Sequence, residues 1–146
     1  MKKKILIILG IAAVLGFIGL AIGLKMYFKK TKDFATADAD FKVTAKQIFD
    51  EYSKDENTSN AKYVVKDKTI EISGTIQTVT DNSDSTKTIV LSVGSPDGDV
   101  SCTLTKEEST KAKVTANSAV VLKGQCTGLQ ELISKEVIMI RCAVVQ

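Results

Sequence analysis

An uninterrupted apolar run near the N-terminus constrains this chain more than any other feature. From Ile5 to Leu24 the sequence reads ILIILGIAAVLGFIGLAIGL, without a charge or a strongly polar side chain. At about 1.5 Å per residue, a helix of this length spans the roughly 30 Å hydrocarbon core of a bilayer. We therefore expect a single-pass membrane anchor with basic flanks over residues 1–30. A cleaved signal peptide is the alternative, because Ala21-Ile22-Gly23 fits a small-x-small cleavage site.

Lysines flank the apolar run on both sides, so charge alone leaves its orientation open. Three lysines precede the run, and four follow it before the first acidic residue, Asp33. From Asp33 onward, 13 basic and 17 acidic residues give a net charge of −4, although the whole chain carries +3. A domain that binds nucleic acid by neutralising phosphates usually has the opposite sign.

The rest of the chain contains a linker and one domain. Residues 31–40 are small and polar without periodicity, and we expect them to link the anchor to a domain over residues 41–146. A capping box formed by Thr44 and Gln47 predicts a helix that frays near residues 57–60. From residue 69 the period changes to two, which predicts strands. The expected strands are residues 69–77, 88–93, 100–104, 119–127 and 136–145, with a short helix from Thr105 to about Val114.

This order of elements is typical of an OB-fold, a five-stranded Greek-key barrel with a helix between its third and fourth strands. Gly74 in the long first strand predicts a bend. We therefore expect a mainly β fold, with an SH3-like barrel or a small sandwich as alternatives. Tyr52 and Tyr63 are expected to pack the N-terminal helix against the barrel. On the last strand, alternation predicts that four side chains point inward: Ile138, Ile140, Cys142 and Val144.

Several short segments also resemble a bacterial family. They are Glu51-Tyr52, Asp55-Glu56-Asn57 and residues 60–63 (NAKY) before the strand with Gly74, and the cysteines in VSC, GQC and RC. Over roughly residues 41–145 the chain is similar to the OB-fold family called tRNA anticodon-binding-like (tRNA_anti-like). Many members of this family are expected to be lipoproteins or membrane-anchored proteins. The resemblance implies an OB-fold but no established activity. Its exported members favour a C-terminal domain outside the cytoplasm, although this chain has an apolar run where the lipoproteins have a lipidated cysteine.

The residue inventory contains no catalytic constellation. Histidine is absent, which removes the commonest general base, the commonest zinc ligand and all Ser-His or Cys-His nucleophilic systems. The cysteines are not spaced as the close pairs of metal sites are, although three inward thiols leave a thiolate site as an alternative. The acidic loops do not match the calcium-binding pattern and suit turns instead. We expect a non-enzymatic protein without metal or cofactor, and an enzyme using paired carboxylates is the alternative.

Cys126 and Cys142 are expected to form a disulfide. The last two strands of an OB-fold are antiparallel neighbours, and a turn centred on Ser134 would place these two residues opposite each other, both pointing inward. Closing this loop stabilises by about 3 kcal/mol in the chain-entropy treatment, provided that the compartment is oxidising. Reduced thiols packed in the core are the alternative, and Cys102 is expected to remain a buried thiol.

The outward side chains of the first three strands form the expected ligand face, because OB-folds bind ligands on the face of strands two and three. No aromatic residue follows Tyr63, so the platforms that stack bases or sugars are missing. The expected ligand-facing residues are small hydroxyl side chains: Thr75, Thr88, Ser92, Ser101 and Thr103. We expect a membrane-tethered binding or assembly module for a protein, peptide or envelope component. The alternative is a nucleic-acid-binding protein tethered to the cytoplasmic face.

Overall fold

The structure, a computed structural model, describes residue 16, residues 18–24 and residues 32–145. The chain divides into two compact units, Met1–Thr31 and Lys32–Gln146. In the first unit, residues 16 and 18–24 are helical. No helix within the described ranges is both long and apolar enough to cross a membrane. The predicted anchor from Ile5 to Leu24 lies for the most part outside these ranges.

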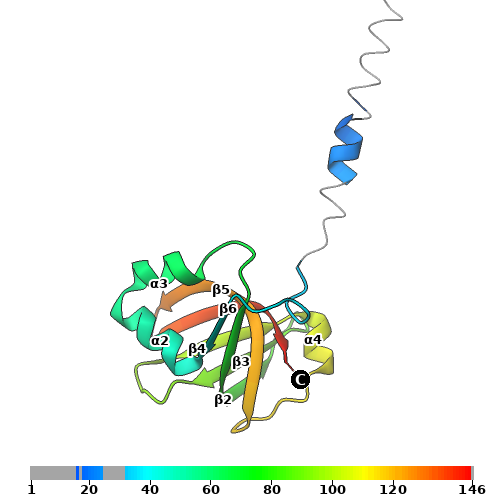
Figure 1. The fold of residues 1–146 in the computed structure, drawn as a ribbon. Coiled ribbons are helices and arrows are strands. Elements are labelled where there is room, and N and C mark those ends of the chain that lie inside the picture. The colour runs from blue at the N-terminus through cyan, green and yellow to red at the C-terminus, as the bar shows by residue number, and fades with distance from the viewer. Residues whose placement is uncertain (1–15, 17, 25–31, 146) are drawn as a thin grey trace, which may run out of the picture. The chain divides into compact units, whose positions relative to one another are not determined.

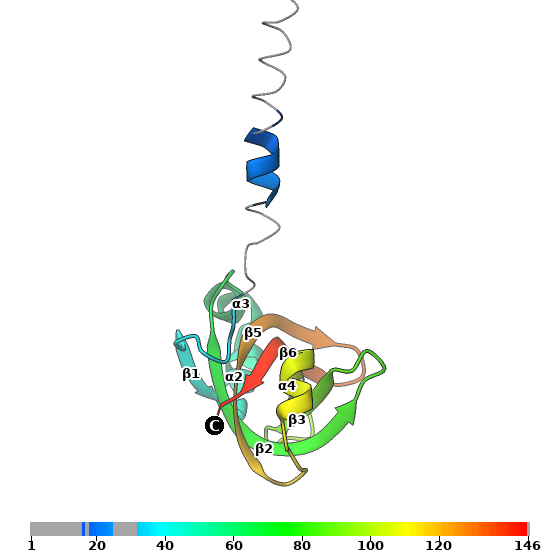
Figure 2. The same cartoon turned by 90° about the vertical axis from the view of Figure 1, so that its right-hand side faces the viewer.

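The second unit has six strands, of which β2 to β6 form a closed barrel and β1 lies beside β2 (Figures 1 and 2). The hydrogen-bonded order is β1-β2-β3-β4-β6-β5, and β5 pairs with β2 to close the ring. Because α4 (Lys106–Lys111) connects β4 to β5, strands β2 to β6 have the order and helix position of an OB-fold. The strands are β1 Phe41–Thr44, β2 Ile70–Asp81, β3 Lys87–Ser92, β4 Gly98–Leu104, β5 Ala119–Glu131 and β6 Lys135–Val144.

The domain has six strands where the sequence predicts five. The additional strand, β1, precedes the first helix. This strand runs parallel to β2 and pairs Phe41 with Ile70 and Thr44 with Ser73. The Asp40 carboxylate fixes the register by accepting a hydrogen bond from the Thr69 backbone N–H at 2.8 Å. Four residues are too few to show a period of two, so this strand is identified by its pairing with β2 and not by its sequence pattern.

Two helices replace the single helix that the sequence predicts. Helix α2 (Ala45–Lys54) begins where expected, with the Thr44 hydroxyl accepting from the Gln47 N–H at 3.1 Å. At Asp55 the chain becomes extended, and the Asp55 carboxylate then caps α3 (Glu56–Tyr63) by accepting from the Thr58 N–H. Figure 1 shows α2 and α3 together at one end of the barrel and α4 at the other.

The two tyrosines pack the helices onto the barrel, as predicted. Tyr52 and Tyr63 are 2% and 0% exposed, and their ring centroids lie 6.2 Å apart. The Tyr52 hydroxyl lies 3.4 Å from the Cys126 Sγ, and the Tyr63 hydroxyl donates to the Glu51 carboxylate at 2.8 Å. Both hydroxyls therefore have partners, which offsets the cost of burying them.

The last strand has a different phase from the predicted one over its first half. Val137 and Met139 are fully buried, whereas Ile138 and Ile140 are partly exposed. Arg141 then adopts a left-handed conformation (φ 53°) at an irregularity of the β5–β6 ladder, and Cys142 points inward again. A bulge of this kind adds a residue to one strand, which reverses the side-chain alternation beyond it.

The predicted disulfide between Cys126 and Cys142 is wrong because of the register of the β5–β6 ladder. In the observed register Cys126 lies opposite Met139, not opposite Cys142. All three cysteines are free and buried, so the alternative of reduced thiols packed in the core describes this structure. The prediction places the centre of the turn at Ser134, whereas the pairing of Glu131 with Lys135 centres it one residue earlier, which shifts every pair of the ladder.

Candidate binding surface

The five predicted ligand-facing residues share the outward face of β2, β3 and β4. Thr75 pairs with Ser92 across β2 and β3, and Thr88 pairs with Thr103 across β3 and β4. Ser101 occupies the row between these pairs, opposite Val90, and is only 8% exposed. The structure therefore brings the five onto one surface, but little of the Ser101 side chain is accessible to a ligand.

Thr88 and Thr103 take part in a hydrogen-bond network inside the domain. Their hydroxyl oxygens lie 3.4 Å apart, and the Asn82 amide donates to the Thr88 hydroxyl at 3.0 Å and to the Thr86 hydroxyl at 2.9 Å. These contacts leave the two threonines less able to bind a ligand than an unpartnered hydroxyl would be.

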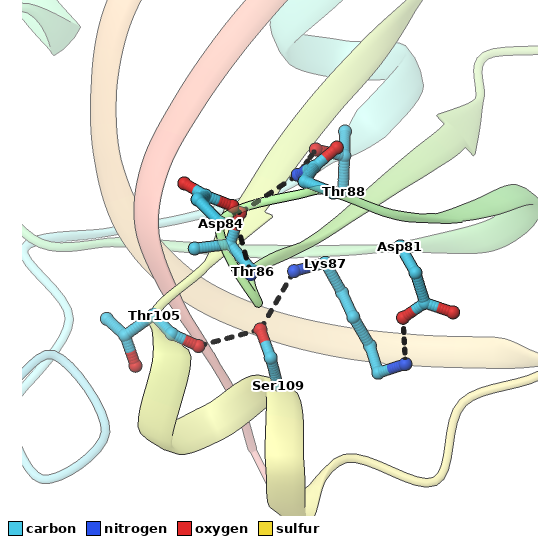
Figure 3. Close-up of polar contacts among 8 residues, drawn as sticks. Asp81, Asp84, Thr86, Lys87, Thr88, Thr105 and Ser109 are labelled. Carbon is cyan, nitrogen blue, oxygen red and sulfur yellow. Dashed lines mark hydrogen bonds and ion pairs between the residues drawn. The ribbon is translucent and has the colours of Figure 1, made fainter.

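The turn between β2 and β3 is stabilised by its own side chains (Figure 3). The Asp84 carboxylate accepts from the Thr86 hydroxyl at 2.6 Å and from the Thr86 N–H, and these bonds lower the pKa of Asp84. Lys87 pairs with Asp81, and its backbone N–H donates to the Ser109 hydroxyl of α4 at 2.8 Å. This acidic loop therefore has the turn chemistry that its composition indicates.

Three rows across β2, β3 and β4 make up this outward face, which we call the strand face. One residue of the nine is charged, Asp99, and none is aromatic. Burial raises the pKa of Asp99, and its neighbour across the β4–β6 ladder is Glu136. The strand face thus provides no cation for a phosphate and no platform for a base. Its nine residues are Thr75, Ser92, Asp99, Thr78, Val90, Ser101, Thr80, Thr88 and Thr103.

A groove lies beside one end of the strand face, where β2 crosses from β3 to β5. The main hollow of this groove, called the central hollow below, has a volume of about 640 Å³. Two of the predicted ligand-facing residues, Thr75 and Ser92, are among those that line it. The other predicted residues, Thr88, Ser101 and Thr103, do not line it. The walls are the first turn of α2, the loop between α4 and β5, and the end of β6; the remaining lining residues are Thr44, Ala45, Lys46, Ser73, Gly74, Lys113, Val114, Ser118, Ala119, Val120, Val121, Val144 and Val145.

The hollow exists because small residues face each other along its floor. Ser73 pairs with Val121 and Thr75 with Ala119 across the β2–β5 ladder. This feature is not apparent from the sequence, because valines in a strand are typical of a core and because the paired residues of β2 and β5 lie far apart along the chain. The signal that could have found it is the run of small outward residues at the start of β5.

The buried cysteines have the character of inert thiols. Hydrogen bonding with Cys102 and burial raise the pKa of Cys142, and burial raises the pKa of Cys126. Across residues 32–145 and the short helical stretch before them, no three Cys, Asp or Glu side chains are grouped to hold a metal ion.

Comparison with known proteins places the chain in a family. A lipoprotein of Klebsiella pneumoniae subsp. pneumoniae MGH 78578 with an inferred nucleic acid-binding role is similar in structure, with a TM-score of 0.57 and 13% identity, covering 80% of this chain and 100% of that one. An Entamoeba histolytica asparaginyl-tRNA synthetase gives a TM-score of 0.38 at 14% identity, covering 56% of this chain and 21% of that one. No curated protein matches this chain. The model of the tRNA_anti-like family matches residues 1–144, so the chain belongs to the tRNA_anti-like family.

Proposed function

We propose that this chain is a membrane-tethered, non-enzymatic OB-fold module that binds a protein or peptide outside the cytoplasm. The observation that carries the proposal is the composition of the strand face: nine outward residues with one charge, acidic, and no aromatic ring. Short hydroxyl and aliphatic side chains, on this face and in the groove beside it, can hydrogen-bond with the backbone of another polypeptide and pack against its side chains. Binding by such a surface is weak. Holding the domain and its partner beside the same membrane raises their effective concentration and so compensates for the weak affinity.

Membrane tethering is supported by the sequence between Ile5 and Leu24, which is as long as a bilayer-spanning helix. The proposed orientation has the N-terminus in the cytoplasm and residues 32–146 outside it. A reporter that is active only in the cytoplasm, fused after Gln146, tests this orientation. Strong reporter activity would reverse it and would place the domain where nucleic acid is accessible.

Nucleic-acid binding is the second candidate, because the similar Klebsiella lipoprotein is named for it. The physical argument against it here is electrostatic. A single-stranded nucleic acid is held by a basic groove and by aromatic rings that stack its bases, whereas this domain has a net charge of −4 and no aromatic residue after Tyr63.

The test uses the full-length protein in detergent with fluorescently labelled single-stranded DNA and RNA at low salt, where electrostatic binding is strongest. We expect no micromolar binding. In parallel, affinity purification from solubilised membranes is expected to recover a protein partner. Salt-sensitive micromolar binding of an oligonucleotide, weakened by Lys66→Glu or Lys123→Glu, would favour the second candidate.

A further inference from the structure

We infer that the groove between β2 and β5 binds an extended, acidic segment of a polypeptide. This inference rests on the proposed function, because it names the site and the ligand chemistry of the same binding module. The site lies beside the strand face, which OB-folds generally use, and shares only the Thr75–Ser92 row with it.

The groove is long enough for several residues of an extended chain, because three hollows share their linings. The central hollow of about 640 Å³ shares Val114 and Val144 with a second of about 750 Å³ that reaches the end of α4. At its other end it shares Ser73 and Val121 with a third of about 210 Å³ beside β1. We call the three together the β2–β5 groove.

The lining alternates between aliphatic and hydroxyl side chains. Val121 and Ala119 of β5 face Ser73 and Thr75 of β2, and no aromatic residue lines any of the three hollows. An acyl chain would be better covered by a continuous apolar wall, and a base or sugar by a ring. A peptide in extended conformation presents small side chains and polar backbone groups in turn, which matches this lining.

The charge of the groove is opposite to that of the domain. Its central hollow is lined by two lysines and no acid, although the residues from Asp33 onward carry a net charge of −4. Lys113 takes part in no salt bridge among residues 32–145. Lys46 pairs only with Asp50, at 2.9 Å, and both side chains are more than half exposed. Such a surface pair contributes little, so a ligand carboxylate can replace Asp50 at small cost.

At the outer ends of the β2–β5 groove the acidic residues already have partners. Glu71 lies 3.2 Å from the Lys42 ammonium and 3.9 Å from that of Lys123, and Glu108 lies 3.6 Å from that of Lys111. The acids at either end are therefore neutralised by their own neighbours. The complementary ligand carries acidic residues next to small aliphatic ones.

The experiment compares two labelled peptides, Asp-Val-Thr-Val-Thr-Val-Asp and Lys-Val-Thr-Val-Thr-Val-Lys, by fluorescence anisotropy with the full-length protein in detergent. We expect the acidic peptide to bind at least about tenfold more tightly, since two favourable surface pairs replace two repulsions. Lys113→Glu should weaken its binding about fivefold, whereas Lys66→Glu, the same charge change on an exposed residue outside the groove, should change it less than about twofold.

A second pair of variants tests shape instead of charge. Ala119→Trp fills the floor of the central hollow and should abolish binding, whereas Thr127→Trp, exposed on the same strand but outside the groove, should not. Equal affinity for the two peptides, equal effects within either pair of variants, or no binding up to millimolar concentration would overturn the inference. A protein partner recovered from another face of the barrel would overturn it while leaving the proposed function standing.

Discussion

Gly124 of β5 lies against Cys142 of β6, and a Cβ atom at position 124 would come within 2.5 Å of the Cys142 Sγ. The glycine sits opposite the bulge at Arg141, where β6 contains an extra residue. The bulge turns Cys142 into the core, and the missing side chain of Gly124 provides the space for its sulfur.

Gly124→Ala should therefore destabilise the domain by about 1–3 kcal/mol, the usual cost of overpacking a core. Urea denaturation of the full-length protein in detergent measures this change. Combining it with Cys142→Ala, which removes the clashing sulfur, should cost less than the sum of the two single changes. Gln130→Ala, an exposed position on the same strand, is the control and should lie within about 0.5 kcal/mol of the parent. Additive effects would show that the two residues do not interact.

The three cysteines should be recovered as thiols. Burial and the raised pKa values of Cys126 and Cys142 make the thiolate scarce, so iodoacetamide should react slowly with the folded protein. After purification without reductant, unfolding in guanidinium should expose three alkylatable thiols by mass spectrometry. A linked peptide pair containing Cys126 and Cys142 would restore the disulfide and contradict the observed register.

Acid should weaken the attachment of α2 and α3 to each other. Burial raises the pKa of Glu51, but hydrogen bonds from Lys62, Tyr63 and Gln47 outweigh it and leave the pKa below its usual value. A carboxyl group with a lowered pKa in the folded state stabilises above its unfolded pKa, and this contribution is lost as pH falls through the folded value. Stability should therefore fall below about pH 4, and less steeply in Glu51→Gln. Identical acid dependence in the two proteins would exclude this role for Glu51.

Ser109 connects α4 to β3, because its hydroxyl accepts from the Lys87 N–H and donates to the Thr105 carbonyl at 2.7 Å. Ser109→Ala leaves a backbone N–H without a partner at a site that is 4% exposed. We expect a loss of about 1–3 kcal/mol in thermal or urea unfolding. The adjacent Thr110→Ala is a matched control on the exposed side of α4, and a comparable loss there would assign the effect to helix propensity instead.

The barrel could be predicted from local patterns, because strands β2 to β6 alternate over enough residues to be recognised and helices α2 and α4 begin at the capping residues Thr44 and Thr105. Three features could not. Strand β1 is too short to show a period, the bulge at Arg141 reverses alternation without a glycine or proline to mark it, and the pairing of Ser73 with Val121 depends on long-range register.

The site was predictable only in part, because its shape depends on elements that are distant in the sequence. Thr75 and Ser92 line the β2–β5 groove, but Thr88, Ser101 and Thr103 do not, although all five point outward. Alternation identifies the face on which a side chain lies. Whether that face is flat or hollow depends on what flanks it, here the first turn of α2 and the loop before β5.

Site-specific photocrosslinking in membranes of the producing cells tests the central claim most directly. A benzophenone amino acid is placed at Ala119 in the β2–β5 groove or at Thr103 on the strand face, in the full-length protein. Binding of a polypeptide in the groove predicts an adduct at position 119 that survives nuclease and is degraded by protease, and no such adduct at position 103. A nuclease-sensitive adduct at position 103, with none at position 119, would contradict both the proposed ligand and the proposed site.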